Sequence, residues 1–272
     1  RILAFGTVSQ LGLLAVVTGY GTRDAMLAGL ALLLSHALFK SALFLVVGVI
    51  DRQLSTRDIG ELSGVGRQAP TLMVFSIIAV GSMAGVIPTI GFVAKEAALT
   101  ALLEESLHGQ PWGIVALVGV ALASVLTAAY GLRFLWGAFG TKKDSEGKTR
   151  QPTAWPDPPI GFLSAPVVLA GLTVVAGAAA SWVDSVIAPF ADTAPASSPG
   201  IAAPEHAYHL ALWHGFEPAL GITALTLALG ALVFWFVEAR GMPKRMMRLT
   251  AADAYNATLR AIGRISVATT RL

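Results

Sequence analysis

The sequence contains no cysteine and carries little charge for its length. Only 13% of its 272 residues are charged, about half the density, near 25%, that is usual in soluble domains. The absence of cysteine excludes disulfides, iron–sulfur clusters and thiolate metal sites. Glycine-rich phosphate loops, nucleophile elbows and nucleic-acid-binding motifs are also absent. We therefore expect no catalytic residue, no bound cofactor and no nucleic-acid partner.

Hydrophobic residues, by contrast, make up 55% of the chain and gather in long runs. Several runs reach the roughly 20 residues that a helix needs to cross a bilayer. The sequence therefore predicts an all-α, polytopic membrane helix bundle. In chain order, the seven predicted spans are 2–20, 25–50, 70–87, 88–106, 112–139, 160–182 and 212–237. Because an apolar span follows Arg1 at once and no methionine begins the chain, we expect a fragment of a longer polypeptide.

Seven alternating crossings would divide the loops between two sides. Most basic residues would then fall on the side that holds 20–24, 140–159 and the C-terminal tail, which the positive-inside rule places in the cytoplasm. The loops expected on the outer side are 51–69, 107–111 and 183–211.

A histidine and a lysine lie in the middle of the second predicted span. His36 and Lys40 are four residues apart, so they share one helix face. A charged group at this depth costs about 2.5 kcal/mol or more and normally faces the bundle interior or water. Both side-chain types can carry and release a proton, so the pair is a candidate step in a proton relay. The alternative is a structural polar contact that ties this helix to its neighbours.

A second charged pair follows a predicted break in the helix pattern at Pro88. Proline removes a backbone donor, and such a break is tolerated in a membrane only where protein or water satisfies the freed groups. Lys95 and Glu96 come next, and adjacent helical positions point in different directions, so we expect them to have different partners. They are candidates for the same relay, or alternatively interfacial charges.

Uncharged polar residues on other spans could hold water or bridge helices. The alternative for each is a simple hydrogen bond between helices. These supporting residues are Thr7, Ser9, Gln10, Ser82, Ser124, Thr127 and Tyr130.

Two further features lie in the last third of the sequence. The densest group of possible metal ligands lacks the spacing of known zinc sites, so we predict no metal there. Its members are Glu205, His206, His209, His214 and Glu217. The tail from 241 to 272 has apolar residues at helical spacing beside arginines, which predicts an amphipathic lateral helix. A disordered basic tail is the alternative.

Three segments resemble a known family when they are taken in order. Ile2–Gly12, Ser35–Leu45 and Gly91–Glu96 are similar to the second half of the antiporter-like subunits shared by respiratory complex I and Mrp-type Na+/H+ antiporters. The resemblance implies that Lys40 is the central lysine of a half-channel, that His36 feeds it, and that Lys95 and Glu96 lie on a broken helix. Complex I members often have a second histidine where this chain has Leu32, so the resemblance implies that water or another helix serves that level.

Within this family, Tyr208–Phe216 and Leu225–Gly230 resemble the large A-type component of Mrp antiporters. The implied division of the chain is a half-channel repeat at 1–140, a cytoplasmic loop at 141–159, further spans at 160–240 and the lateral helix.

The resemblance implies a proton-translocating, non-enzymatic segment of a bacterial cell-membrane Na+/H+ antiporter. Its partners would be other antiporter subunits and the lipid bilayer, and its transported ions H+ and Na+. The alternatives are a proton-pumping component of complex I or of a membrane-bound hydrogenase, and a scaffold that transports nothing.

Overall fold

The structure is a computed structural model that describes residues 1–107, 111–144, 146–197, 207–240, 256–260 and 264. Most of these residues are helical, which confirms the all-α prediction. The β-type pairing found among them is an isolated bridge between Lys143 and Thr149. The chain forms two units, Arg1–Leu232 and Val233–Leu272. In order, the helices are α1 (Ile2–Gly19), α2 (Arg23–Leu54), α3 (Val65–Gln68), α4 (Pro70–Ala84), α5 (Ile90–Leu107), α6 (Pro111–Phe139), α7 (Ile160–Ala178), α8 (Ala180–Ala191) and α9 (Pro218–Arg240).

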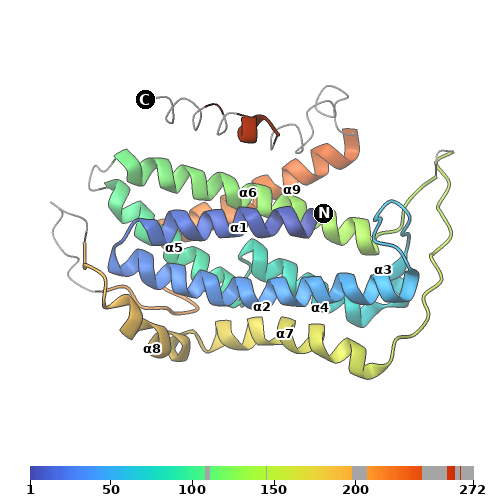
Figure 1. The fold of residues 1–272 in the computed structure, drawn as a ribbon, viewed down its shortest axis with the longest axis horizontal. Coiled ribbons are helices and arrows are strands. Elements are labelled where there is room, and N and C mark those ends of the chain that lie inside the picture. The colour runs from blue at the N-terminus through green and yellow to red at the C-terminus, as the bar shows by residue number, and fades with distance from the viewer. Residues whose placement is uncertain (108–110, 145, 198–206, 241–255, 261–263, 265–272) are drawn as a thin grey trace. The chain divides into compact units, whose positions relative to one another are not determined.

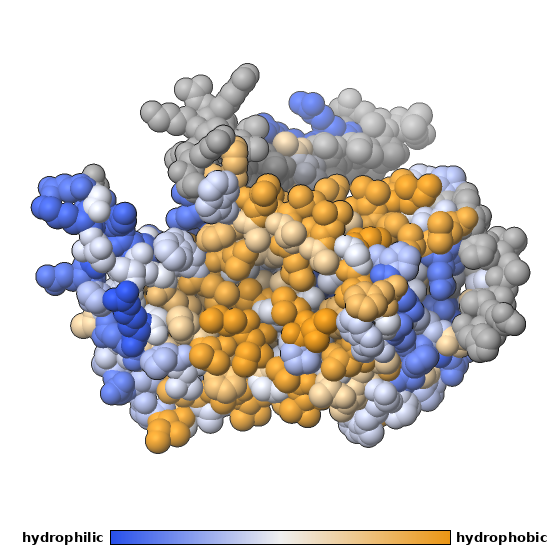
Figure 2. Space-filling model, turned by 180° about the vertical axis from the view of Figure 1, so that it is seen from behind, coloured by the Kyte–Doolittle hydropathy of each residue, from blue (hydrophilic) through white to orange (hydrophobic). Residues whose placement is uncertain are grey.

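Five of these helices are long and apolar enough to cross a membrane, namely α1, α2, α6, α7 and α9. Large apolar side chains remain exposed on them, for example Leu122 and Leu126 on α6, at 61% and 60%. Figure 2 shows apolar residues gathered over the middle of one face, with hydrophilic residues toward its two ends. Such a surface fits lipid around the middle and water at the ends.

Helices α4 and α5 both pack against the single long helix α2, each along one half of it. One buried cluster joins Leu27 and Leu32, in the first half of α2, to Val93 on α5. A second cluster joins Leu43, in the second half of α2, to Met83 on α4. Figure 1 shows α4 and α5 following one another along α2. The two helices therefore form one interrupted crossing, so Pro88 marks a break within the membrane-spanning bundle, the second of the two alternatives for it, instead of a tight turn between the separate spans 70–87 and 88–106.

This interrupted crossing changes which loops share an end of the bundle. The amide of Thr153 donates to the carbonyl of Ser63 at 2.8 Å, so the loops 55–69 and 140–159 lie together. At the other end of α2, the amide of Arg23 donates to the carbonyl of Pro195 at 2.7 Å. The prediction that 20–24 and 140–159 share one side is therefore wrong. The sequence pattern gives the lengths of apolar segments but not whether the chain turns back between them.

Two smaller differences concern the later part of the chain. The helix in the span expected at 160–182 ends earlier, at Ala178. The next helix, α8, extends to Ala191, into the region that was predicted as a loop after 182. The predicted lateral helix at 241–272 lies outside the described residues, except that 256–260 are helical and 264 is described.

Candidate functional site

Lys40 lies where four helices meet. Its side chain is only 5% exposed, and its Nζ lies 4.0 Å from Met83 Sδ in the last turn of α4. The hydroxyl of Tyr130, on α6, lies 3.4 Å from the same sulfur. A Cβ atom placed on Gly6 of α1 would lie 3.0 Å from Lys40 Nζ and 2.9 Å from Tyr130 Oη. The missing side chain at Gly6 therefore makes room for both polar ends.

A chain of polar side chains leads from α1 to this lysine. Gln10 Nε2 donates to Thr127 Oγ1 at 3.1 Å, both residues being buried. The side chains of Thr127 and Gln10 both lie within hydrogen-bonding reach of the hydroxyl of Tyr130. Tyr130 follows Thr127 by three residues, less than one turn of α6. Three of the predicted supporting residues are thus brought together beside Lys40. Thr7 bonds instead to the Leu3 carbonyl of its own helix at 3.0 Å, and Ser9 is exposed.

His36 lies one turn before Lys40 and is half-buried. Its Nε2 is buried and has no hydrogen-bond partner among the described residues, and its ring meets Phe39 edge-on at 5.6 Å. Helix α1 runs antiparallel to α2, since Thr18 packs against Gly29 and Gly6 against Lys40. The same register places Gln10 at the level of His36. The level at which the resemblance implied water or another helix is that of Leu32, one turn away along α2, and that expectation stays a prediction.

Lys95 occupies the interruption between α4 and α5. Its Nζ donates to the carbonyl of Ala84, the last residue of α4, at 3.1 Å. The next residue, Gly85, has a φ of 89°, a conformation that glycine adopts without steric cost. The last carbonyls of a helix lack intrahelical partners and carry partial negative charge. An ammonium group at this place satisfies one of them, so Lys95 caps α4 inside the bundle.

Glu96 directly follows Lys95 on α5. It is 1% exposed, and its Oε2 has no hydrogen-bond partner in the described part of the chain. Burial, followed by the carboxylates of Glu96 and Glu217, raises the pKa of Tyr208 in the segment before α9. Glu96 therefore belongs to a different neighbourhood from Lys95, as expected of adjacent helical positions.

Of the remaining predicted residues, Ser82 lies at the interruption, where a Cβ added to Gly91 of α5 would be 2.8 Å from its hydroxyl oxygen. Ser82 and Ser124 each have a buried hydroxyl without a hydrogen-bond partner among the residues described. His214 stacks on Tyr208 with ring centroids 4.9 Å apart, and its Nε2 lies 2.9 Å from the carbonyl of His209. Glu205 and His206 lie outside the described residues.

Some residues at the site escaped sequence reasoning. Thr100 follows Glu96 by four residues, and that helical spacing was a usable signal. Met83 looks like any core methionine, and Tyr208 belongs to a segment without periodicity. Met83 comes close to Lys40, and Tyr208 to the part of α5 that holds Glu96, only through the packing of separate parts of the chain.

Comparison with known proteins gives consistent matches along the chain. Residues 1–127 match the family described as NADH:quinone oxidoreductase/Mrp antiporter, transmembrane. The A-type subunit of the Na(+)/H(+) antiporter of Alkalihalophilus pseudofirmus is 33% identical over 260 residues, covering 87% of this chain and 31% of the relative. The A/B-type subunit of a probable K(+)/H(+) antiporter of Rhizobium meliloti is 29% identical over 239 residues, covering 87% of this chain and 23% of the relative.

A solved structure extends the similarity to the fold. The Mrp complex from a Dietzia species contains a chain that superposes with a TM-score of 0.75 and 30% identity, covering 99% of this chain and 27% of that one. The present chain thus spans about a third, or less, of the length of these relatives. It belongs to the antiporter-like membrane family that Mrp antiporters share with NADH:quinone oxidoreductase, and within that family it is similar to part of the A-type subunit.

Proposed function

We propose that this chain is the proton-translocating segment of a multi-subunit Na+/H+ antiporter and that Lys40 is its central proton carrier. The observation that carries the proposal is a lysine buried among four helices, whose ammonium group lies beside a thioether and a glycine in the described part of the chain. A buried ammonium without a counter-ion is costly, so the group has reason to exchange its proton. Residues 1–140 would form the half-channel.

Protons would reach Lys40 along polar side chains on neighbouring helices. Gln10 and Thr127 are hydrogen-bonded to one another, and Tyr130 lies between them and the lysine. His36, at the level of Gln10, has a ring nitrogen without a partner among the described residues. Water held by these groups would complete the path, as polar residues inside membrane proteins commonly do.

Lys95 would pass charge across the interruption between α4 and α5. Its ammonium group contacts Ala84, while that of Lys40 lies near Met83, the preceding residue. A proton on one lysine disfavours a proton on the other, because like charges repel strongly where the dielectric constant is low. Glu96 Oε2 has no hydrogen-bond partner among the described residues. Glu96 would then connect the relay to the end of the bundle beside Tyr208.

The basic residues support an orientation for the chain. The end with the loops 55–69 and 140–159 carries most of them, whereas Arg23 is the basic residue described at the opposite helix ends and loops. The positive-inside rule then places the first end in the cytoplasm and the loop 20–22 outside. A bacterial cell membrane and neighbouring antiporter subunits follow from the proposed role.

The transported cation is proposed from the relatives' names. Three similar proteins are named for Na+ and one for K+. We infer Na+, with exchange of Na+ and K+ to be measured side by side in everted membrane vesicles from cells that carry the complete complex.

Replacement of Lys40 tests the central claim. In everted vesicles, Lys40→Ala is expected to lower Na+/H+ exchange by about 100-fold, since the group that accepts and returns the proton is lost. Lys40→Arg is expected to fail as well, because arginine does not release its proton. Exchange is measured as the recovery of a pH-sensitive dye after Na+ is added.

The matched control is Lys143→Ala, which removes an exposed lysine from the loop 140–159 and should leave exchange unchanged. Assembly of the complex is checked by native gel electrophoresis for each variant. Wild-type exchange in an assembled Lys40→Ala complex would contradict the proposal and favour a scaffold role. Proton pumping that depends on electron flow instead of a Na+ gradient would favour a component of a redox complex.

A further inference from the structure

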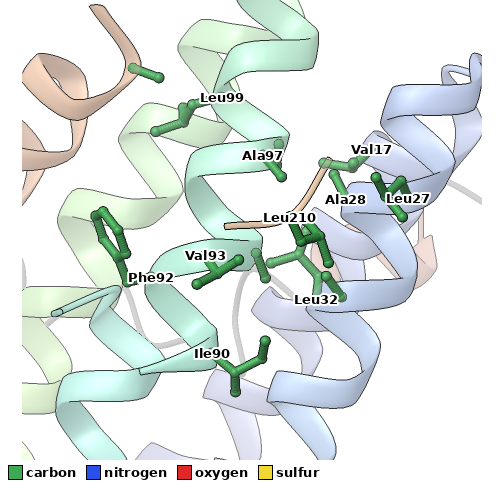
Figure 3. Packing of buried hydrophobic residues seen from close by; sticks show 14 of the residues in the cluster. Val17, Leu27, Ala28, Leu32, Ile90, Phe92, Val93, Ala97, Leu99 and Leu210 are labelled. Atoms are coloured by element: carbon green, nitrogen blue, oxygen red, sulfur yellow. The ribbon is translucent and has the colours of Figure 1, made fainter. Parts of the chain in front are cut away.

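Residues 207–217, called the inserted segment below, enter the bundle between two helices. Leu210 is 0% exposed and belongs to the buried cluster of α2 and α5. Figure 3 shows its side chain between Val93 and Ala97 on one side and Ala28 and Leu32 on the other. A loop that covered the bundle from outside would not need an apolar side chain at this depth.

Polar contacts hold the inserted segment in this place. The guanidinium of Arg23, at the start of α2, donates to the carbonyl of Tyr208 and pairs with Asp192 at 2.9 Å. The amide of Leu210 donates to Asp184 of α8 at 2.7 Å. Two helices and a buried leucine therefore fix the position of the Tyr208 backbone.

Polar groups without partners lie behind this segment. Glu96 Oε2 and Thr100 Oγ1 are both buried without a hydrogen-bond partner among the described residues. Tyr208 packs against the buried cluster that contains Ala97 and Leu99, the residues of α5 next to Glu96 and Thr100. A buried carboxylate that lacks partners needs access to water or to a proton donor. Tyr208 therefore lies against the stretch of α5 that holds Glu96 and Thr100.

We propose that the inserted segment is a plug that closes the path from Glu96 to the outer end of the bundle, with Tyr208 as the residue that blocks it and Leu210 as its anchor. The proposal takes its direction from the proposed function, because it supposes that Glu96 exchanges protons with the outer side. The closure itself is a statement about access, and a measurement that involves no transport can test it.

The test is the rate at which a thiol reagent reaches a cysteine behind the plug. Thr100→Cys is introduced in the complete complex after its other accessible cysteines have been replaced, and a small membrane-impermeant methanethiosulfonate is added to the outer or the inner face of membrane vesicles. With Tyr208 intact we expect slow labelling. Adding Tyr208→Ala or Leu210→Ala should accelerate labelling from the outer face by about tenfold or more, because closure is lost locally.

Two further variants separate the plug from a general effect on folding. Trp213→Ala removes a side chain of the same segment that is 51% exposed, and it should leave the labelling rate unchanged. Tyr208→Phe keeps the ring and should label as slowly as the parent. Equal rates in the Tyr208→Ala, Leu210→Ala and parent complexes would overturn the plug, even if Lys40→Ala abolishes exchange. Faster labelling in a complex whose Lys40→Ala variant still exchanges ions would support the plug while refuting the proposed relay.

Discussion

At the scale of single residues, the two buried lysines meet the same turn of one helix from different directions. Lys40 reaches the side chain of Met83, and Lys95 reaches the backbone of Ala84. The first contact is weak, because a thioether is a poor acceptor. The second is a charge-assisted hydrogen bond to a helix end, and such bonds are the stronger kind. Lys40 is therefore better suited to change its protonation state, and Lys95 to hold the interruption together.

Gly6 offers a test of how closely the Lys40 site is fitted. A methyl group there would press on Lys40 Nζ and Tyr130 Oη, at 3.0 and 2.9 Å. Because the two side chains can yield, Gly6→Ala should assemble normally while exchange falls by about tenfold from the displaced groups. Gly12→Ala, on the same helix, meets nothing within 4 Å and is the control. Equal exchange rates in the two variants, measured in everted vesicles, would contradict the fitted site.

At the scale of helices, the interruption between α4 and α5 depends on its neighbour α7. Gly177 of α7 lies so close that an added Cβ would be 2.3 Å from the Pro88 carbonyl oxygen and 2.5 Å from the Thr89 carbonyl carbon. Both contacts are with backbone, which cannot move aside as a flexible side chain can. Helix α7 therefore supports the segment where backbone groups have lost their helical partners.

Gly177→Ala should accordingly destabilise the folded protein. The expected cost is about 1–3 kcal/mol, because overpacking forces the backbone apart. It is measured as a lower temperature of irreversible unfolding of the detergent-solubilised complex, together with reduced yield. Gly171→Ala, in the same helix, adds a methyl group with nothing within 4 Å and should unfold with the parent. A Gly177→Ala complex as stable as the Gly171→Ala complex would refute the close support.

The helices and their interruption also show what the sequence can predict. Apolar length identified the long helices, and Pro88 marked the break, because proline and the cost of buried charge act locally. Whether α5 continues in the direction of α4 or turns back depends on packing against α2, which no local pattern records. For the same reason Tyr208 and Leu210 were not predicted, since a single leucine in an irregular segment has no periodic signal. Lys40 and Gln10 were both identified, but their proximity depends on the register of α1 against α2.

At the scale of the first unit, residues 1–232, the bundle has two ends of different charge. The end with Arg67 and Lys148 is rich in basic residues. At the other end, Arg23 forms an ion pair with Asp192. If the first end is cytoplasmic, cysteines at 67 and 148 should react with an impermeant thiol reagent in everted vesicles only. A cysteine at Thr193 should react in intact cells.

The three labelling experiments use Arg67→Cys, Lys148→Cys and Thr193→Cys, all at exposed positions, in the complete complex. Their shared readout is the mass increase of the chain after treatment. The interrupted crossing requires positions 67 and 148 to react from the same face. Reaction of position 67 from the same face as position 193 would instead restore the seven-span arrangement.

The site of Lys95 has one more consequence, which concerns the membrane voltage. The interruption lies near the middle of α2, between the two clusters that α4 and α5 form with it. An ion or proton that arrives there from either surface has crossed roughly half of the electric field, worth about 1 kcal/mol at 100 mV. Loading this position is then favoured from one side and opposed from the other by the resting potential itself. If Lys95 passes protons as proposed, a helix broken at mid-depth would make the charge on this lysine respond to the membrane potential.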